Sequence, residues 1–285
     1  MNPSEIIRPA KQSDRRSIER FLIDGIAMHR HLDWRLPIEW LGKSPFLLFL
    51  NTKNNIKAII NCAPEPEDVF WIRLFACRDP SKISLCWNKL FPEVLQRIAN
   101  LSDSPTLASL AYHEWMIELL EIEGWSKAQK VIQMKWDHQE GEIPANNFSN
   151  QTKIRRMIKK DIQEVSEIDQ LCFTKIWQLS FEAFKHAFDQ SEYATVFEMD
   201  QEIYGFQFST KLNKNAHLAR IAVHPQFQHR GIGENLTRNM LHYFLAQGIY
   251  NISVNTQESN VRSINMYEKL KFKKTGSTFP IFIYS

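Results

Sequence analysis

The chain contains 285 residues, of which 44% are hydrophobic and 12% aromatic. This length and this share of apolar side chains exclude a disordered or fibrous protein and predict roughly two globular domains. With 35 Lys and Arg against 32 Asp and Glu, the formal net charge of +3 is too small to indicate a nucleic acid or a membrane as partner. No segment approaches the roughly 18 consecutive apolar residues of a membrane span, and the first residues lack the pattern of a signal peptide. We therefore expect a soluble, cytoplasmic protein.

The four cysteines are scattered singly through apolar or strand-like stretches, and no two of them are spaced as Cys-x-x-Cys. This pattern is typical of buried free thiols in a reducing compartment. The four residues are Cys62, Cys77, Cys86 and Cys172.

The predicted domain boundary is a polar segment from His138 to Lys153, where Gly, Pro, Asn and Ser cluster and apolar residues are few. Such residues interrupt regular structure. We expect a first domain over residues 1–140, a linker over 141–152 and a second domain over 153–285.

The two halves share landmarks at a constant offset of 147 residues. One offset that holds across separate elements indicates an ancient duplication, although the halves share few identical residues. The matched landmarks are Ile7-Arg8 and Asp14 with Ile154-Arg155 and Asp161, Ile56 with Ile203, Arg73 with Arg220, and Trp125 with Phe272.

Hydrophobic periodicity predicts the order of elements most clearly in the second half. Asp161 can cap a helix whose apolar residues keep helical spacing through Cys172, and a second helix follows around 181–188. A polar turn then separates the two strands of a hairpin. The strands and helices from that hairpin onward are expected at 195–199, 203–209, 217–223, 236–244, from Ile252, at 260–270 and around Phe282. This order predicts an α+β fold.

The segment between the strand at 217–223 and the next helix contains Gly231 and Gly233. Glycines let the backbone approach a ligand closely, and the amides at a helix start favour an anion such as a pyrophosphate. A nucleotide P-loop would need a Gly-Lys-Ser or Gly-Lys-Thr ending, and a dinucleotide-binding fingerprint would need a third glycine where Leu236 stands. Both are therefore excluded, but from the two glycines alone a diphosphate cradle and a simple tight turn fit equally well.

Two flanking segments supply the context: the strand with its end at 218–225, and the run NVRSINMYEKLKF over 260–272. Together with the glycine segment they resemble the GCN5-related N-acetyltransferase (GNAT) family, over residues 153–285. The last helix is most similar to the subgroup of ribosomal-protein alanine acetyltransferases, with Lys271 in place of the usual glycine. The resemblance implies two tandem GNAT-like (acyl-CoA N-acyltransferase) domains, each with a mixed, mostly antiparallel sheet flanked by helices.

The resemblance also implies acetyl-CoA as cosubstrate, without a metal, and roles for particular residues. Backbone groups of Ile221, Ala222 and Val223 would bind the pantetheine arm, which Asn260 would also contact. Tyr267 would act as general acid and protonate the leaving thiolate of coenzyme A. The pyrophosphate would lie in a cradle formed by Gln228, His229, Arg230, Gly231, Ile232 and Gly233.

The proton acceptor is not identified by this resemblance. Asn255 occupies the position, five residues before Asn260, where the N-terminal acetyltransferases place a catalytic glutamate, and an amide cannot accept a proton from an ammonium group. Glu258, His224 or a water molecule held by Asn255 stay open as alternatives. Tyr267 has an alternative too, because it lies on the apolar side of its helix and also fits a packed core residue.

The same offset tests the first half for a second site. The cradle glycines and the residues equivalent to Asn260 and Tyr267 are missing there, so we interpret residues 1–140 as a degenerate GNAT-like domain without a coenzyme A cradle. This domain would supply structure and part of the acceptor site. Gln228, Gly231, Gly233, Asn260 and Tyr267 correspond to Ser81, Ser84, Cys86, His113 and Leu120.

Our leading hypothesis is an N-acetyltransferase whose second domain transfers acetyl from acetyl-CoA to a primary amine of a protein N-terminus, a lysine or a small molecule. An acyl-CoA-binding sensor or pseudoenzyme, which the missing glutamate favours, and an interaction module are the alternatives. The basic run from Lys153 to Lys160 is more typical of a solvated or linker face than of a nucleic-acid site. We expect a monomer, because two linked halves can mimic a family dimer, and a homodimer stays open.

Overall fold

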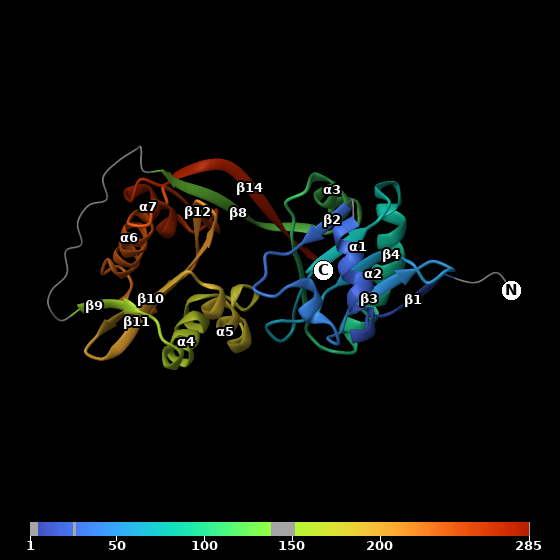
Figure 1. Cartoon of the computed structure of the whole chain (residues 1–285), viewed down its shortest axis with the longest axis horizontal. Helices are drawn as coiled ribbons and strands as arrows, with labels where there is room; N and C mark the ends of the chain where they lie inside the picture. The colour runs from blue at the N-terminus through green and yellow to red at the C-terminus, as the bar shows by residue number, and fades with distance from the viewer. Residues whose placement is uncertain (1–4, 25–26, 138–151, 285) are drawn as a thin grey trace. The chain divides into compact units, whose positions relative to one another are not determined.

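The computed structural model describes residues 5–24, 27–137 and 152–284 of the chain (Figure 1). It divides into two compact units, a first of residues 1–128 with 280–285 and a second of residues 129–279. The division lies ahead of the predicted linker at 141–152, most of which falls outside the described residues. The predicted domain ranges therefore differ from the units that the chain forms.

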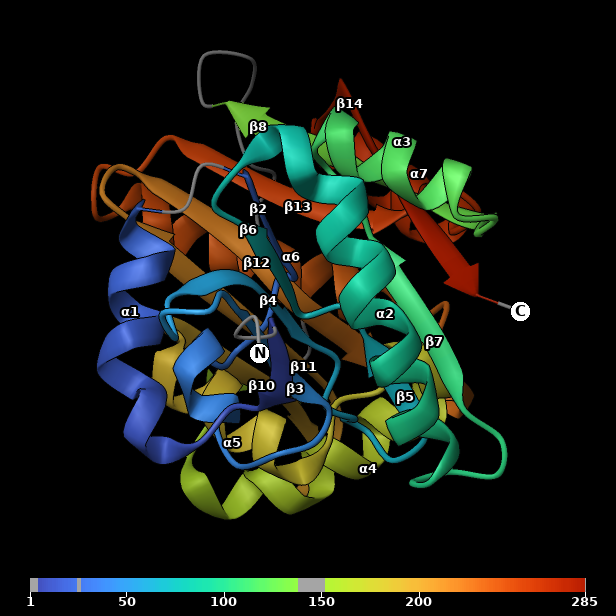
Figure 2. The same cartoon turned by 90° about the vertical axis from the view of Figure 1, so that its right-hand side faces the viewer.

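The first unit is built on a five-stranded antiparallel sheet in the order β1-β3-β4-β6-β2. Its strands are β1 (Ile6–Pro9), β2 (Ala27–Arg30), β3 (Phe46–Leu50), β4 (Ile56–Asn61) and β6 (Leu74–Cys77). Successive side chains of a strand point to opposite sides, so alternate residues of β3, β4 and β6 enter two different cores. Helix α1 (Arg15–Asp24) covers one face and α2 (Ile83–Ala99) covers the other (Figure 2).

A second group of strands in the first unit consists of β5 (Val69–Trp71), β7 (Thr106–Leu110) and the end of β14 (Lys273–Tyr284). β5 runs parallel to β7, and residues 281–284 of β14 pair antiparallel with β7. Helix α3 (Glu114–Ile122) contributes apolar side chains to the same core as α2.

The second unit contains a mixed, mostly antiparallel sheet in the order β14-β8-β13-β12-β11-β10-β9. The β12–β13 pair is parallel, whereas β8–β13, β11–β12, β10–β11 and β9–β10 are antiparallel. The strands are β8 (Ser126–Asp137), β9 (Thr152–Arg156), β10 (Tyr193–Met199), β11 (Glu202–Leu212), β12 (Asn215–Val223) and β13 (Asn251–Gln257). The helices are α4 (Ile162–Cys172), α5 (Phe181–Gln190), α6 (Ile232–Leu245) and α7 (Val261–Lys269). The predicted α+β fold and its element order are confirmed.

The two faces of the second sheet carry different helices (Figure 1). Phe206 and Phe208 of β11 point to the face where they contact Phe184 of α5. Gly205 points to the other face, where an added Cβ would lie 3.1 Å from Ile232 Cγ2 of α6. The missing side chain at Gly205 therefore lets α6 pack closely on β11. None of the described helices is long and apolar enough to cross a membrane.

The predicted offset of 147 residues is present in the structure. The bounds of α3 and β8 correspond residue for residue to those of α7 and β14. The ion pair between Arg8 and Asp14 recurs between Arg155 and Asp161, with closest N–O distances of 2.7 and 2.6 Å. In both cases the aspartate also accepts a backbone N–H three residues before it, at the start of the first helical turn. The two halves therefore follow one structural plan.

The last strands of the two repeats are exchanged. β8 ends the first repeat, but its residues 131–137 pair with β13 in the second unit. β14 ends the second repeat, and its residues 281–284 pair with β7 in the first unit. Because β8 pairs in this way, the structural division falls at Ala128, before that strand ends, and not in the polar segment after it.

Candidate functional site

Strands β12 and β13 are paired over only part of their length. Residues 215–218 of β12 pair with residues 251–254 of β13. Beyond this point β12 continues alongside β11, and β13 continues alongside β8. Among the described residues no strand takes the place beside residues 219–223 on this side, so the edge of β12 offers unpaired backbone groups to a ligand.

Ile221 and Val223 of β12 direct their backbone groups to this open edge. The His224 N–H donates to the Tyr204 carbonyl on β11 at 2.8 Å. Backbone groups alternate between the two edges of a strand, so Ala222 takes part in the ladder with β11, whereas Ile221 and Val223 face the open edge. Of the three backbone contacts expected from the sequence, the one at Ala222 therefore points away from the open edge.

The carbonyl of Val223 is already engaged. It accepts hydrogen bonds from Gln228 Nε2 and from Cys172 Sγ, each at 3.1 Å. The Gln228 side chain, expected in the cradle, instead holds the loop against the end of β12. The groups that remain at the edge are the N–H and C=O of Ile221 and the N–H of Val223.

The loop after β12 presents its backbone at the start of α6. His229 and Gly231 have positive φ angles of 64° and 78°, and Gly231 precedes Ile232, the first residue of the helix. The first amides of a helix have no partner within it and lie at the positive end of its dipole. A Cβ on Gly231 would meet only Asn235 Nδ2, at 3.5 Å, so the space in front of this residue is open. These amides fit a phosphate group of coenzyme A.

Gly233 joins the three segments that the sequence singles out. A Cβ on this residue would lie 3.2 Å from Met266 Sδ on α7 and 3.7 Å from Val223 Cγ2 on β12. The end of β12, the start of α6 and the helix that carries Tyr267 therefore meet at one place. Close packing between these segments is a sufficient reason for the second glycine.

The remaining side chains of the cradle segment differ in their surroundings. Ile232 is buried in a small core with Phe197 of β10 and Leu236 of α6, so only its backbone can face a ligand. Arg230 is exposed, and its guanidinium carbon lies 4.7 Å from the centre of the Phe227 ring. His229 is exposed as well.

Helix α7 carries Tyr267, the expected proton donor, and begins directly after Asn260, which is expected to contact the pantetheine arm. Tyr267 is only 2% exposed and belongs to the core that includes Leu218 and Val254, the last pair before β12 and β13 part. Burial raises the pKa of the Tyr267 hydroxyl, so the phenol keeps its proton at neutral pH. Asn260 caps α7, because its Oδ1 accepts the Ser263 N–H at 3.2 Å. Tyr267 is thus a core residue that also holds a proton beside the open edge.

Polar residues that the sequence pattern did not single out lie on the opposite face of the sheet. His217 of β12 and Ser253 of β13 are joined by a hydrogen bond of 2.8 Å between Nδ1 and Oγ. Burial lowers the pKa of His217 to about 4, so the imidazole is neutral at neutral pH. The Oδ1 atom of Asn255 is buried and has no hydrogen-bond partner among the described residues. A histidine inside an apolar strand was the one sequence signal for this group.

The model of the acetyltransferase (GNAT) family matches residues 162–272 of this chain, which include the open edge, the cradle and α7. This segment of the chain matches the GNAT family. A curated protein of Bacillus subtilis (strain 168), provisionally named ribosomal protein bS18-alanine N-acetyltransferase, is 26% identical over 125 residues, which cover 43% of this chain and 82% of that protein.

Solved structures resemble this chain over nearly its whole length. A tandem GNAT protein from the clavulanic acid biosynthesis pathway has a TM-score of 0.68 and 10% identity, with 99% of this chain and 98% of that chain covered. A GCN5-related N-acetyltransferase from Sphaerobacter thermophilus has a TM-score of 0.63 and 13% identity, with 98% and 95% covered. At these identities the likeness shows the fold, and it confirms the tandem GNAT arrangement.

Glu258 and His224, the two side chains proposed from the sequence as proton acceptors, lie outside the paired part of β12 and β13. The Glu258 side chain is exposed, and its backbone N–H donates to the Lys130 carbonyl at 2.9 Å. His224 Nδ1 accepts the Gln226 N–H at 3.3 Å in the turn before the cradle. Along the chain, His217 and Asn255 therefore lie closer than His224 and Glu258 to the point where β12 and β13 separate.

A buried ion pair holds α4 to the site strand. The Arg220 guanidinium donates to both carboxylate oxygens of Asp169 at 2.7 Å and to the Trp177 carbonyl at 2.7 Å. Its carbon lies 3.6 Å from the centre of the Phe173 ring. Burial raises the pKa of Asp169, and the charge and hydrogen bonds of Arg220 oppose that rise. Because this carboxylate is committed to Arg220, it is not a free proton acceptor.

The first unit differs from the second at each equivalent place. Strand β6 pairs along its whole length with β4 on one edge and with β2 on the other. In the short 3-10 helix of residues Pro80–Lys82 that leads into α2, the Asp79 carboxylate accepts hydrogen bonds from the backbone and the hydroxyl of Ser81, at 3.0 and 2.7 Å. Leu120, which corresponds to Tyr267, is fully buried.

Proposed function

We propose that the second unit transfers the acetyl group of acetyl-CoA to a primary amine. The observation that carries this proposal is the open edge of β12 at residues 219–223, which ends at the amides of the α6 start. A single extended ligand with a peptide-like arm and a diphosphate can satisfy both groups at once. The match of residues 162–272 to the GNAT family model supports acyl transfer in general, and the acceptor is our inference.

The backbone of the site would bind and orient the donor. Ile221 and Val223 would hydrogen-bond the arm as an added strand does, and the amides after Gly231 would hold the diphosphate. Acetyl-CoA, when bound, supplies an activated acetyl thioester. Holding the arm along a rigid strand fixes the carbonyl of that thioester in one place, which lowers the entropic cost of attack by the amine.

The side chains on the two faces of the sheet would divide the proton transfers between them. Tyr267, which holds its proton at neutral pH, would donate it to the leaving sulfur. On the other face, Asn255 Oδ1 would accept an N–H of the amine and His217, as a neutral imidazole, would receive its proton. The absence of a free carboxylate beside these two residues, among those described, favours an amine that reaches the site uncharged.

The first unit would bind no acetyl-CoA. Its own strand β2 lies along the edge of β6, where the second unit is open, and the Asp79 carboxylate takes the Ser81 amide at the helix start. A ligand would have to displace a strand and a charged group at the same time. We therefore expect one donor site in each chain.

A calorimetric titration with acetyl-CoA tests the donor site. Gly231→Asp places a carboxylate and a side chain in front of the cradle amides, so we expect the affinity to fall at least about 100-fold, or about 3 kcal/mol. Gly248→Asp is the matched control. Gly248 follows the other end of α6, its φ of 71° is positive as that of Gly231 is, and no atom lies within 4 Å of an added Cβ. Ser84→Asp is the control in the first unit and leaves binding unchanged. Equal losses in all three variants, or two sites in the wild type, contradict the proposal.

Tyr267→Phe tests the proton donor. We expect kcat to fall about 100-fold in an assay of free thiol release, because the leaving thiolate loses its proton source. The dissociation constant for acetyl-CoA stays unchanged, since the hydroxyl makes no hydrogen bond to another described residue. Tyr243→Phe, on α6 of the same unit, is the control for removal of a phenol hydroxyl. An unchanged kcat would assign Tyr267 to the core alone.

An acceptor screen decides between the enzyme and a binding protein. The Bacillus subtilis relative is named for a ribosomal-protein alanine, so peptides with an N-terminal alanine come first, followed by lysine peptides and small amines. Thiol release that depends on one acceptor class supports the transferase. Binding of acetyl-CoA without turnover of any amine would instead make the chain an acyl-CoA sensor, which the amide at Asn255 favours.

A further inference from the structure

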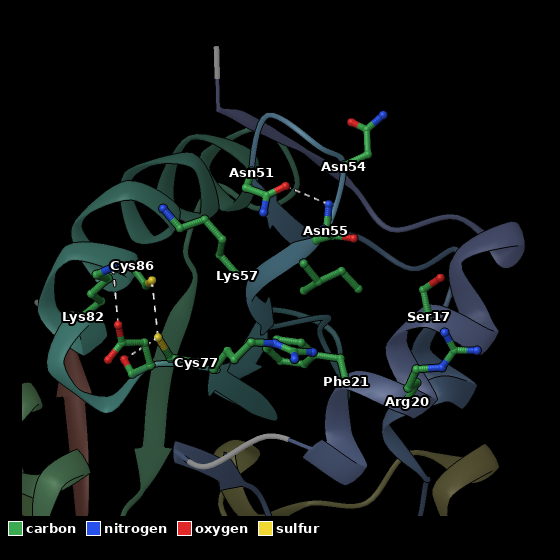
Figure 3. A pocket seen from close by; sticks show the side chains of 13 residues that line it. Ser17, Arg20, Phe21, Asn51, Asn54, Asn55, Lys57, Cys77, Lys82 and Cys86 are labelled. Carbon is green, nitrogen blue, oxygen red and sulfur yellow. Dashed lines mark hydrogen bonds and ion pairs between the residues drawn. The ribbon is translucent and has the colours of Figure 1, made fainter. Parts of the chain in front are cut away.

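The first unit contains a pocket of about 550 Å³ that shares no lining residue with the donor site (Figure 3). Its walls come from α1, from the turn between β3 and β4, and from the end of β6 with the start of α2. Four cationic side chains line it, namely Arg20, Lys57, Arg78 and Lys82. The Asp79 carboxylate lines the pocket as well, and Lys82 and Lys57 form ion pairs with Asp79 and Glu5, so cationic side chains outnumber the one lining carboxylate.

Two thiols face each other in the wall of this pocket. Figure 3 shows the sulfur atoms of Cys77, the last residue of β6, and Cys86, in the first turns of α2, joined by a hydrogen bond of 3.4 Å. Each of these cysteines is only 1% exposed, so a reagent must enter the pocket to reach them. A disulfide needs its sulfurs within about 2.05 Å of each other, so a small side-chain movement suffices.

The two sulfurs are not equivalent. When Cys77 is ionised, its sulfur accepts the hydrogen bond of the Cys86 thiol, which lowers the pKa of Cys77 to about 7. The backbone at Asp79 and the charge of Lys57 act in the same direction, whereas burial and the Asp79 charge oppose them. The same hydrogen bond raises the pKa of Cys86. Cys77 is therefore the sulfur that carries a thiolate near neutral pH, and Cys86 is the neighbouring thiol.

The other two cysteines differ from this pair. Burial raises the pKa of Cys62, which is fully buried. Burial also raises the pKa of Cys172 to about 11, and its Sγ donates to the Val223 carbonyl. Neither has a second sulfur beside it among the described residues. They are internal controls for any reaction of Cys77.

We propose that Cys77 and Cys86 form an oxidation site that hydrogen peroxide converts to a disulfide. The Cys77 thiolate attacks one peroxide oxygen, so that an S–O bond forms, the O–O bond breaks, and the departing hydroxide takes up a proton as water. The Cys86 sulfur then attacks Cys77, the S–O bond breaks, and a second water leaves. In total the two thiols are oxidised, peroxide is reduced to two waters, and the protein loses two hydrogen atoms.

The pocket suits this reaction for two reasons. It admits a small polar oxidant to sulfurs that are otherwise covered. Lys57 and Arg78 also line it, and positive charge stabilises both the thiolate and the departing hydroxide. The bond formed would join β6 to α2 within the first unit.

Mass spectrometry of the full-length chain tests the proposal directly. After treatment with hydrogen peroxide we expect the mass of the intact, uncapped chain to fall by about 2 Da. After capping of the free thiols we expect a digest fragment in which Cys77 is joined to Cys86. Treatment with a dithiol reductant restores both thiols. Oxidation confined to Cys62 or Cys172, or no bridge between Cys77 and Cys86, overturns the proposal.

Single variants assign the two steps. In Cys86→Ser the peroxide-treated Cys77 stops at the sulfenic acid, which dimedone traps, whereas Cys77→Ser gives neither a bridge nor a dimedone adduct at Cys86. Cys172→Ser is the matched control and forms the bridge as the wild type does. At pH 7 iodoacetamide labels Cys77 of Cys86→Ser, which keeps a hydroxyl donor beside Cys77, at least about tenfold faster than Cys172, and equal rates contradict the role of Cys77.

Discussion

Strands β6 and β12 occupy equivalent places in the two repeats but have different neighbours. Ile60 of β4 pairs with Phe75 of β6, whereas Gln207 of β11, which corresponds to Ile60 at the offset of 147 residues, pairs with Ile221 of β12, one residue before the equivalent of Phe75. On its second edge Phe75 also pairs with His29 of β2, whereas Ile221 has no strand partner there among the described residues. One repeat has covered the edge that the other leaves open.

This difference shows two ways in which a binding edge is lost. At the helix start the change is local, because Ser84 and Cys86 stand where Gly231 and Gly233 stand in the second unit. Along the strand the change is in the fold, because β2 fills the edge with hydrogen bonds of its own. Restoring the glycines alone would therefore not restore a site in the first unit.

Proline substitutions test the two edges and have the largest expected effect. Phe75→Pro removes a ladder hydrogen bond and a buried aromatic side chain, so we expect a loss of at least about 5 kcal/mol and unfolding of the first unit. Ile221→Pro removes an N–H that faces the open edge, so stability changes little and acetyl-CoA affinity falls about tenfold.

Urea unfolding and calorimetry measure these two effects, with Ile221→Val as the control for the side chain. If Ile221→Pro unfolds the second unit as Phe75→Pro unfolds the first, then the edge of β12 is not open in solution.

The buried arginines of the two units give the next largest effect. Arg220 donates to both oxygens of Asp169, which is fully buried, whereas Arg73 donates to Asp33 and to the Ala63 and Glu65 carbonyls. Asp169→Asn leaves a buried charge without compensation and costs about 3–5 kcal/mol.

Asp33→Asn leaves Arg73 with its carbonyl partners and costs about 1–2 kcal/mol. Urea midpoints of the two variants measure the difference. A larger loss for Asp33→Asn would mean that the carbonyls contribute little.

Acid pH is expected to lower the free energy of unfolding of the two units to different extents, with a smaller effect for each residue than the substitutions above. Burial lowers the pKa of His29 in β2 and of His217 in β12 to about 4, and it lowers the pKa of His31 as well. An unfolded imidazole takes up a proton near pH 6.5, so acid favours the unfolded chain between pH 6.5 and about 4. A histidine with a pKa of about 4 contributes about 3 kcal/mol that is complete above pH 6.5 and lost at about pH 4.

The first unit, with two such residues, therefore loses more stability than the second as the pH falls from 7 to 5. Urea titrations at both pH values, with peptides of each unit followed by hydrogen exchange, measure this loss. His29→Gln narrows the difference between the units, and an unchanged difference would contradict the assignment.

Much of the site could be predicted from the sequence because it depends on neighbours along the chain. The glycines at 231 and 233, the apolar strand before them and the helix that holds Asn260 and Tyr267 lie in order within about fifty residues. The structure adds the direction of each backbone group, so that Ile221 and Val223 face the edge and Ala222 does not. It also gives Gln228 and Asn260 structural hydrogen bonds that no pattern indicated.

The sequence by itself determined the repeat, the order of helices and strands, and the turn that presents amides at the start of α6, because periodicity and glycine act locally. Only the tertiary structure decided which strands pair. The exchange of β8 and β14, the covering of β6 by β2, the parting of β12 from β13 and the meeting of Cys77 with Cys86 all join distant segments or different elements. Pairing between distant segments follows from the packing of the whole chain, so local patterns do not reveal it.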